Sequence, residues 1–157
     1  MTLLEYNDLI KLFAAQDPDL MHTEEQEAVH CCSADEAAAL LRGISDRMVL
    51  LLPPYAKNPR DNSAMGNMWF KQGLVIAVEF VPVGDKVRKL QVLNKAEQVL
   101  DRLYKFLNHS RRGDPLIPGV APFAFDPKTW ESDGIGPISE NHFGYFAEFV
   151  LRDGIQL

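Results

Sequence analysis

Two histidines and two cysteines near the start of the chain belong to the residue types most often found as metal ligands. They are His22, His30, Cys31 and Cys32. Zinc sites usually take ligands in pairs about two to four residues apart and need a second pair elsewhere, which this sequence lacks. Adjacent cysteines also spread poorly around one ion and rarely form a relaxed disulfide. We therefore interpret this group as partly buried small residues, and we expect neither a metal nor a cofactor.

Nucleophilic catalysis needs a serine or cysteine with a base within hydrogen-bond distance. The candidate residues are Ser139, His109 and His142, and no Gly-x-Ser-x-Gly motif accompanies them. Each falls in a predicted loop or helix end, where chance polarity explains it equally well. Arg111 and Arg112 follow a predicted helix and could touch phosphate, but cations there also suit the helix dipole. The sequence has no Gly-rich phosphate-binding motif, so we predict no nucleotide site.

Paired carboxylates are the remaining candidates for acid–base chemistry. Asp126, Glu131, Asp133 and Glu140 lie in a stretch rich in proline and glycine, where acidic residues usually serve turns and solvation. Glu79 is more informative because it stands inside an apolar segment. A carboxylate there must be paired, protonated or directed at a partner chain. A structural or edge position is favoured over a catalytic one, so we predict no catalytic residue.

The elements that position these side chains centre on one strand and one helix. Residues Gly73–Val83 are β-branched and aromatic, which predicts a strand covered on both sides or nearly so. Lys86–His109 predicts a long amphipathic helix. Its apolar residues, three or four apart, are expected to form one core-facing stripe: Val87, Leu90, Leu93, Ala96, Val99, Leu100, Leu103 and Leu107.

Shorter elements flank this pair. A helix over 3–15 ends at Asp17-Pro18, and a capping box at Ser33 and Glu36 starts a second helix that stops near Gly43. Met68–Phe70 either begins the central strand or forms a hairpin arm beside it. The remaining predictions are loops over 19–30 and 56–66 and strands over 47–52 and 143–151.

The fold class predicted from this order is α+β, with a mostly antiparallel sheet, helices packed on one face and one long central helix. The chain has 157 residues, 46% hydrophobic and 24% charged, which fits a single domain over 1–157. A net charge of -6 argues against a partner held by phosphate contacts. The sequence has no signal peptide pattern and no apolar run of membrane-spanning length, so we expect no membrane partner.

The segment 111–141 is predicted to be a long loop rich in proline, glycine and aromatic residues, with a short strand at Phe123–Phe125. Loops of that length in compact domains are usually functional or disordered. Phe123, Phe125 and Trp130 either tuck under the domain or insert into a neighbouring protein, and both alternatives stay open. We assign them as the candidate protein-interaction residues. Trp130→Ala is accordingly expected to weaken association and leave the melting temperature nearly unchanged.

Three stretches together resemble small subunits of phage tails. They are the strand Met48–Leu52, the end of the long helix at Leu100–Leu107 and the closing segment Asn141–Leu151. The nearest group is the tail-terminator and neck (tail-completion) proteins, found as prophage genes in bacterial genomes. The resemblance spans about residues 35–152. It implies a mixed sheet flanked by helices and a ring, often hexameric, at the head-proximal end of the tail.

The predicted function is therefore a structural subunit of a phage tail or neck. It would bind its own copies in a ring and other tail proteins, in the cytoplasm of the bacterial host and in the virion once assembled. Two alternatives remain: an adaptor module of a bacterial cytosolic system, and an enzyme whose site lies near Glu79 or His142. A closed oligomer in solution would favour the first of the three.

Overall fold

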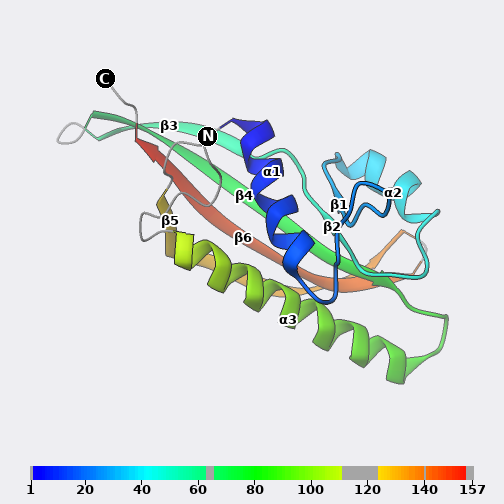
Figure 1. Cartoon of the computed structure of the whole chain (residues 1–157). Helices are drawn as coiled ribbons and strands as arrows, with labels where there is room; N and C mark the ends of the chain where they lie inside the picture. Colours follow the sequence, from blue (N-terminus) through cyan, green and yellow to red (C-terminus); the bar gives the residue numbers. More distant parts are fainter. Residues whose placement is uncertain (1, 63–65, 111–123, 140, 155–157) are drawn as a thin grey trace.

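The computed structural model describes residues 2–62, 66–110, 124–139 and 141–154. Within these residues the protein has three helices and a six-stranded sheet. Figure 1 shows two long, curved strands crossing the whole molecule, with α1 and α3 lying side by side on the face toward the viewer. The elements in chain order are α1 (Leu3–Gln16), β1 (Val29–His30), α2 (Ala34–Leu41), β2 (Val49–Leu51), β3 (Ala56–Asn62), β4 (Gly66–Phe80), α3 (Lys86–Ser110), β5 (Ala124–Ile138) and β6 (His142–Gly154).

The sheet is ordered β1-β2-β4-β6-β5, and β3 pairs with the first half of β4. Only β1 and β2 run parallel within the described pairs; the others are antiparallel. The longest pairing joins β4 to β6, from Met68 opposite Gly154 to Phe80 opposite His142. These two strands therefore form the spine of the sheet, and β5 is an edge strand.

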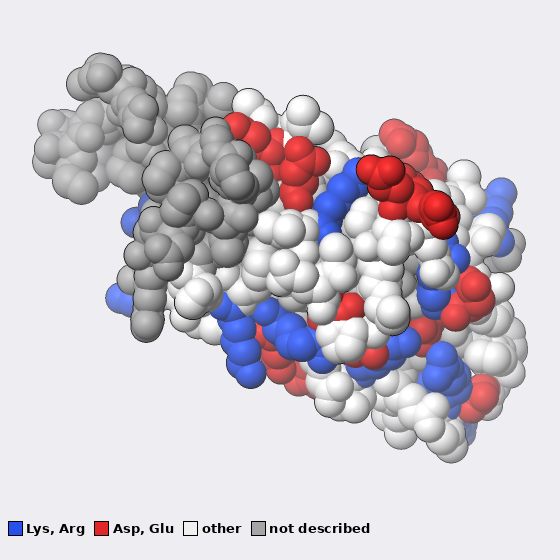
Figure 2. Space-filling view, in the orientation of Figure 1, with Lys and Arg blue, Asp and Glu red and all other residues white. Residues whose placement is uncertain are grey.

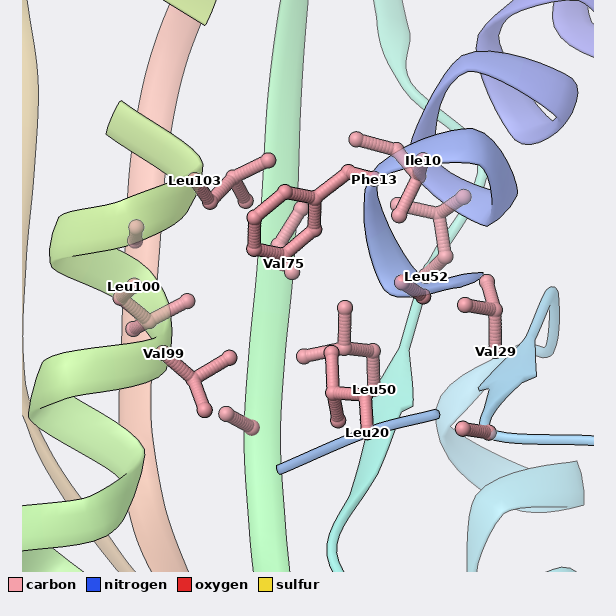
Figure 3. Packing of buried hydrophobic residues seen from close by; sticks show 14 of the residues in the cluster. Ile10, Phe13, Leu20, Val29, Leu50, Leu52, Val75, Val99, Leu100 and Leu103 are labelled. Carbon is pink, nitrogen blue, oxygen red and sulfur yellow. The ribbon is translucent and has the colours of Figure 1, made fainter. Parts of the chain in front are cut away.

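The main core lies between this spine and the helices α1 and α3. Because side chains alternate along a strand, Val75 and Ala77 of β4 share one face and are fully buried. Figure 3 shows Phe13 of α1 and Leu103 of α3 meeting over Val75. Gly73 lies on the same face, and an added Cβ there would be 2.8 Å from the ring of Phe149, so only glycine lets that ring approach.

The short helix α2 packs on the opposite face, over β2 and the adjoining end of β4. Val78 of β4 joins Val49 and Leu51 of β2 beneath it in a second, smaller cluster. The α+β class, the mostly antiparallel sheet and the one long helix are thus confirmed, with both longer helices on one face and α2 on the other. Among the described residues, no helix combines the length and apolar character needed to cross a membrane.

Local hydrogen bonds fix where the helices begin. At α1 the Thr2 hydroxyl accepts from the Glu5 amide at 3.2 Å, and the Glu5 carboxylate accepts from the Thr2 amide at 2.6 Å, which is a complete capping box. At α2 the predicted Ser33 cap is present, its hydroxyl accepting from the Glu36 amide at 3.4 Å. At α3 the Asp85 carboxylate accepts from the Arg88 amide at 2.9 Å. Side chains close to the turns thus satisfy amides that the helices leave free.

Two predicted loops are wrong. Residues Ala56–Asn62 form β3, which pairs residue by residue with β4, and Ala124–Ile138 form β5, a strand of 15 residues. The expected short strand at Phe123–Phe125 is the start of β5, which begins at Ala124. Residues 111–123 lie outside the described part of the chain. Edge strands tolerate proline and glycine because their outer amides need no partner, which is why composition misled the prediction.

The predicted core stripe of the long helix is wrong at its N-terminal end. Val87 and Leu90 are 69% and 68% exposed, whereas Val92, which the stripe omitted, is fully buried. At 100° per residue these two positions point away from the side that carries Val92 and Ala96. The residues of α3 that do face the sheet are Val92, Ala96, Val99, Leu100, Leu103 and Leu107.

Candidate interaction surfaces

Glu79 is a buried carboxylate on a central strand, paired with two cations. It is 2% exposed and lies on the α1/α3 face of β4. Arg88 Nη2 donates to its Oε2 at 2.7 Å, and Lys95 Nζ donates to its Oε1 at 2.8 Å. Of the alternatives for a carboxylate in an apolar strand, pairing is the one found. These two bonds fasten the first half of α3 to the centre of the sheet.

A second buried carboxylate fastens α3 to α1. Asp17, just past the end of α1, accepts from Arg102 Nε at 2.5 Å and from its Nη2 at 3.1 Å. Arg102 also donates to Asp19 at 2.7 Å. The hydrogen bonds to Asp17, and then those to Asp19, raise the pKa of Arg102 above its ordinary value, against the opposing effect of burial. The two buried acidic side chains, Glu79 and Asp17, therefore hold α3 against the sheet and against α1.

The serine and histidine candidates hold main-chain oxygens instead of each other. The hydroxyl of Ser139 donates to the carbonyl of Ala38 at 3.3 Å. The buried imidazole of His142 bonds through Nε2 to the carbonyl of Ile44 at 2.8 Å. Both contacts join the β5–β6 turn to the segment around α2. His109, near the end of α3, is exposed.

An open hollow of about 400 Å³ between α1, β1 and α2 is lined by His30, Cys31 and Cys32, three of the four residues first considered as ligands. His30 Nε2 bonds to the Glu27 carbonyl at 3.1 Å, and burial lowers the pKa of His30. Burial also raises the pKa of the Cys32 thiol, which keeps it protonated. Among the described residues, the hydrogen bond of His30 goes to the Glu27 carbonyl and none joins its ring to either thiol. Within the described residues, no three His, Cys, Asp or Glu side chains are placed to hold a metal.

The loop aromatics are packed against the core. Phe125 is 2% exposed, and Trp130 is partly buried and stacks on Phe149 with ring centroids 5.5 Å apart. Tyr104 of α3 meets the Trp130 ring edge-on at 5.4 Å. Phe125 and Trp130 thus tuck under the domain, the first of the two alternatives, and they bind α3 to β5 and β6. Phe123 lies outside the described residues.

A different group of apolar side chains is exposed, at the turn from β4 into α3. Val83 is 90% exposed, and Val87 and Leu90 follow it on the outward side of the helix. The turn is tight, with the Asp85 amide donating to the Pro82 carbonyl at 3.1 Å. We name this surface the tip patch: Val83, Val87 and Leu90 with the exposed lysines Lys86 and Lys89.

The second surface is on the opposite side of the sheet, beyond the part that α2 covers. Cα register places Leu74 of β4, Glu148 of β6 and Glu131 of β5 in one row across three strands. The neighbouring row holds Ile76, Phe146 and Asp133. We name this surface the acidic sheet face: the partly exposed Leu74, Phe146, Val150 and Glu148 with the exposed Glu131 and Asp133.

The predicted carboxylate group is therefore divided. Glu131 and Asp133 lie on the acidic sheet face, and Asp133 Oδ1 also accepts from the Gly134 amide at 2.7 Å. Asp126 is bound by Arg152 and caps a turn by accepting from the Lys128 amide at 3.1 Å. Glu140 lies outside the described residues. Register across strands, which sequence alone does not reveal, is what brings Glu131 beside Glu148.

Charge is distributed unevenly over the molecule. Figure 2 shows many Lys and Arg side chains, with Asp and Glu among them, along the lower part of the visible face where Figure 1 places α3, and further Asp and Glu side chains above. The stretch 86–96 carries Lys86, Arg88, Lys89 and Lys95 and no acidic residue. Helical angles alone could have separated Val87 and Leu90 from the core stripe.

Comparison with protein-family models, curated proteins and solved structures gives no match to this chain.

Proposed function

We propose that this protein is a structural subunit that works by binding protein chains, its own copies included. The observation that carries the proposal is the exposure of three apolar side chains at the tip patch, Val83 at 90%, Val87 at 69% and Leu90 at 68%. Fully burying such a side chain is worth roughly 1.5–3 kcal/mol, so a partner that covers all three gains several kcal/mol. The turn and the first turn of α3 hold them in fixed positions, which lowers the entropy lost on binding.

The setting we propose is the head-proximal end of a phage tail, where the sequence resemblance to tail-terminator and neck proteins leads. Copies of the chain would close into a ring and contact other tail proteins. Assembly would take place in the cytoplasm of the bacterial host, and the assembled protein would be part of the virion. A ring is also the natural product of one repeated head-to-tail contact when the rotation between copies closes.

Light scattering after size-exclusion chromatography, over a range of protein concentrations, tests the proposal. The wild type is expected to elute as an oligomer whose mass rises with concentration to a fixed limit. Val87→Gln combined with Leu90→Gln is expected to shift it toward the monomer, because the apolar contact is lost. The melting temperature should stay within about a degree, since both side chains are exposed and glutamine is a good helix former.

Leu4→Gln combined with Met21→Gln is the matched control, because these apolar side chains are 69% and 67% exposed and lie outside the tip patch. This control should associate as the wild type does. A wild type that stays monomeric at every concentration would contradict the proposed function. Electron microscopy of the oligomer addresses the phage setting, for which closed rings are expected and open filaments or compact dimers are the contrary result.

A further inference from the structure

The acidic sheet face holds like charges in an unfavourable arrangement. Glu131 and Glu148 are direct Cα partners on neighbouring antiparallel strands, so both side chains project from the same face. Like charges directly opposite each other destabilise a sheet. The ion pairs of the described residues involve neither carboxylate. Cations brought by a partner would relieve this repulsion.

The tip patch has the opposite imbalance. Lys86 and Lys89 stand in the first turn of α3, where the positive end of the helix dipole disfavours cations. Arg88 in the same turn is accounted for by Glu79 at 2.7 Å, and Lys89 Nζ lies 4.6 Å from the ring centre of Phe143. Neither lysine takes part in an ion pair of the described residues. A carboxylate from a partner would pair with these lysines.

These two surfaces cannot meet within one molecule. The tip patch faces outward from α3, on one side of the sheet, and the acidic sheet face lies on the other side. Each surface combines apolar side chains with charges that form no ion pair among the described residues. Their charges are opposite in sign, and Val83, Val87 and Leu90 match the apolar Leu74, Phe146 and Val150 in character.

We infer that the partner of the tip patch is the acidic sheet face of a second copy of this chain. The contact is head-to-tail: the outer side of α3 of one copy lies on the back of the sheet of the next, with Lys86 and Lys89 beside Glu131 and Glu148. Such a heterologous contact repeats from copy to copy and closes into a ring when the rotation permits. The inference rests on the proposed function and specifies which surfaces touch.

Two charge-reversal variants test this pairing by sedimentation equilibrium. Lys86→Glu/Lys89→Glu reverses the tip patch, and Glu131→Lys/Glu148→Lys reverses the acidic sheet face. Each variant alone is expected to associate at least about tenfold more weakly than the wild type, because the contact then brings like charges together. Mixed in equal amounts, the two variants should recover association, since every contact between unlike copies again joins opposite charges.

Glu24→Lys/Glu25→Lys is the matched control for the face variant, with the same change in net charge at exposed residues outside both surfaces. It should associate as the wild type does, and circular dichroism should show that all variants are folded. Self-association of the wild type should also weaken as salt rises from about 0.05 M to 0.5 M, because salt screens the charge pairs.

The outcomes separate this inference from the proposed function. If the face variant associates like the wild type while Val87→Gln/Leu90→Gln does not, the tip patch binds another surface and the inference is overturned, with the proposed function intact. If the wild type never associates, both fail. If the wild type is monomeric but sediments with phosphatidylserine vesicles through Lys86 and Lys89, the occupant is a lipid surface, and the inference is again overturned.

Discussion

The two faces of the β4–β6 pair are built from alternate residues of the same strands, yet they treat charge differently. On the face covered by α1 and α3, Glu79 is buried and holds both Arg88 and Lys95. On the other face, Glu148 lies opposite Glu131, and neither carboxylate forms an ion pair among the described residues. The α1/α3 face therefore pairs its buried carboxylate within the molecule, whereas the acidic sheet face leaves its carboxylates available to a partner.

The aromatic residues repeat this contrast. Phe149 is 1% exposed and contacts the rings of Tyr6, Phe125 and Trp130. Phe146, on the opposite face of the same strand, is only partly buried. The difference teaches that stability is concentrated on the α1/α3 face, whereas the acidic sheet face contributes less to folding and remains free for contact.

The largest effect is expected for Phe149→Ala, which is compared with Phe146→Ala on the opposite face of the same strand. Phe149→Ala should lower the free energy of unfolding by about 3–5 kcal/mol, because it leaves a cavity in a close-packed aromatic cluster. Phe146→Ala should cost less than about 1.5 kcal/mol, since its ring is partly in water already. Urea unfolding followed by circular dichroism measures both. Equal losses of unfolding free energy in the two variants would contradict the proposed difference between the faces.

Trp130→Ala comes next, with an expected loss of about 2–3 kcal/mol from the stacking on Phe149 and the edge contact with Tyr104. The prediction from sequence of an unchanged melting temperature is therefore replaced by a fall of several degrees. Lys128→Ala, an exposed neighbour on β5, is the control and should change little. A Trp130→Ala protein that keeps its melting temperature but no longer associates would show that Trp130 belongs to the interface.

Removing one charge from each face gives a smaller but sharper test, because the signs differ. Glu79→Gln should cost about 1–3 kcal/mol, since it weakens two charged hydrogen bonds in a buried site. Glu148→Gln should stabilise the isolated chain by about 0.2–0.5 kcal/mol, because it removes repulsion from Glu131. Thermal unfolding at low salt and low protein concentration measures both. A loss in the Glu148 variant would show that this carboxylate has a stabilising partner.

The pH dependence is the smallest effect. Burial, then the charge of Lys11, lowers the pKa of His22 below its ordinary 6.5, and its Nδ1 accepts from the Ala28 amide at 2.9 Å. The unfolded chain then binds the proton first as pH falls, so stability declines from about pH 6.5 down to the lower pKa of the folded state. His22→Gln keeps an acceptor without the titration. Between pH 7 and 5 the melting temperature of the wild type should fall more than that of this variant. Parallel curves of melting temperature against pH would contradict the assignment of this effect to His22.

The elements that sequence predicts correctly are those whose signals are local. α2 begins at the predicted Ser33 cap, α3 covers the predicted long helix, and the apolar runs in the second half of β4 and in β6 form strands, although β4 ends at Phe80 and not at the predicted Val83. The strands β3 and β5 were missed because their residues resemble turns. What makes them strands is backbone pairing with β4 and β6, and that pairing comes from segments elsewhere in the chain.

The candidate surfaces were less predictable than the fold. Phe125 and Trp130 are aromatic residues in a stretch that reads as irregular, and this misplaced them outside the core. Val87 and Leu90 had the spacing of core residues but the wrong angle relative to Val92. The Glu131–Glu148 contact depends on the register of two strands with a shift between them, and no local pattern records such a register.

The outer edge of β5, which pairs with no other strand among the described residues, limits how copies of this protein can join. Pro127 and Pro137 lack amide hydrogens, and the strand loses register between Asp126 and Glu131 and again between Ile135 and Ile138. A strand from another molecule would find only short runs of donors and acceptors there. Crowded copies are thus not expected to merge their sheets into fibrils along β5.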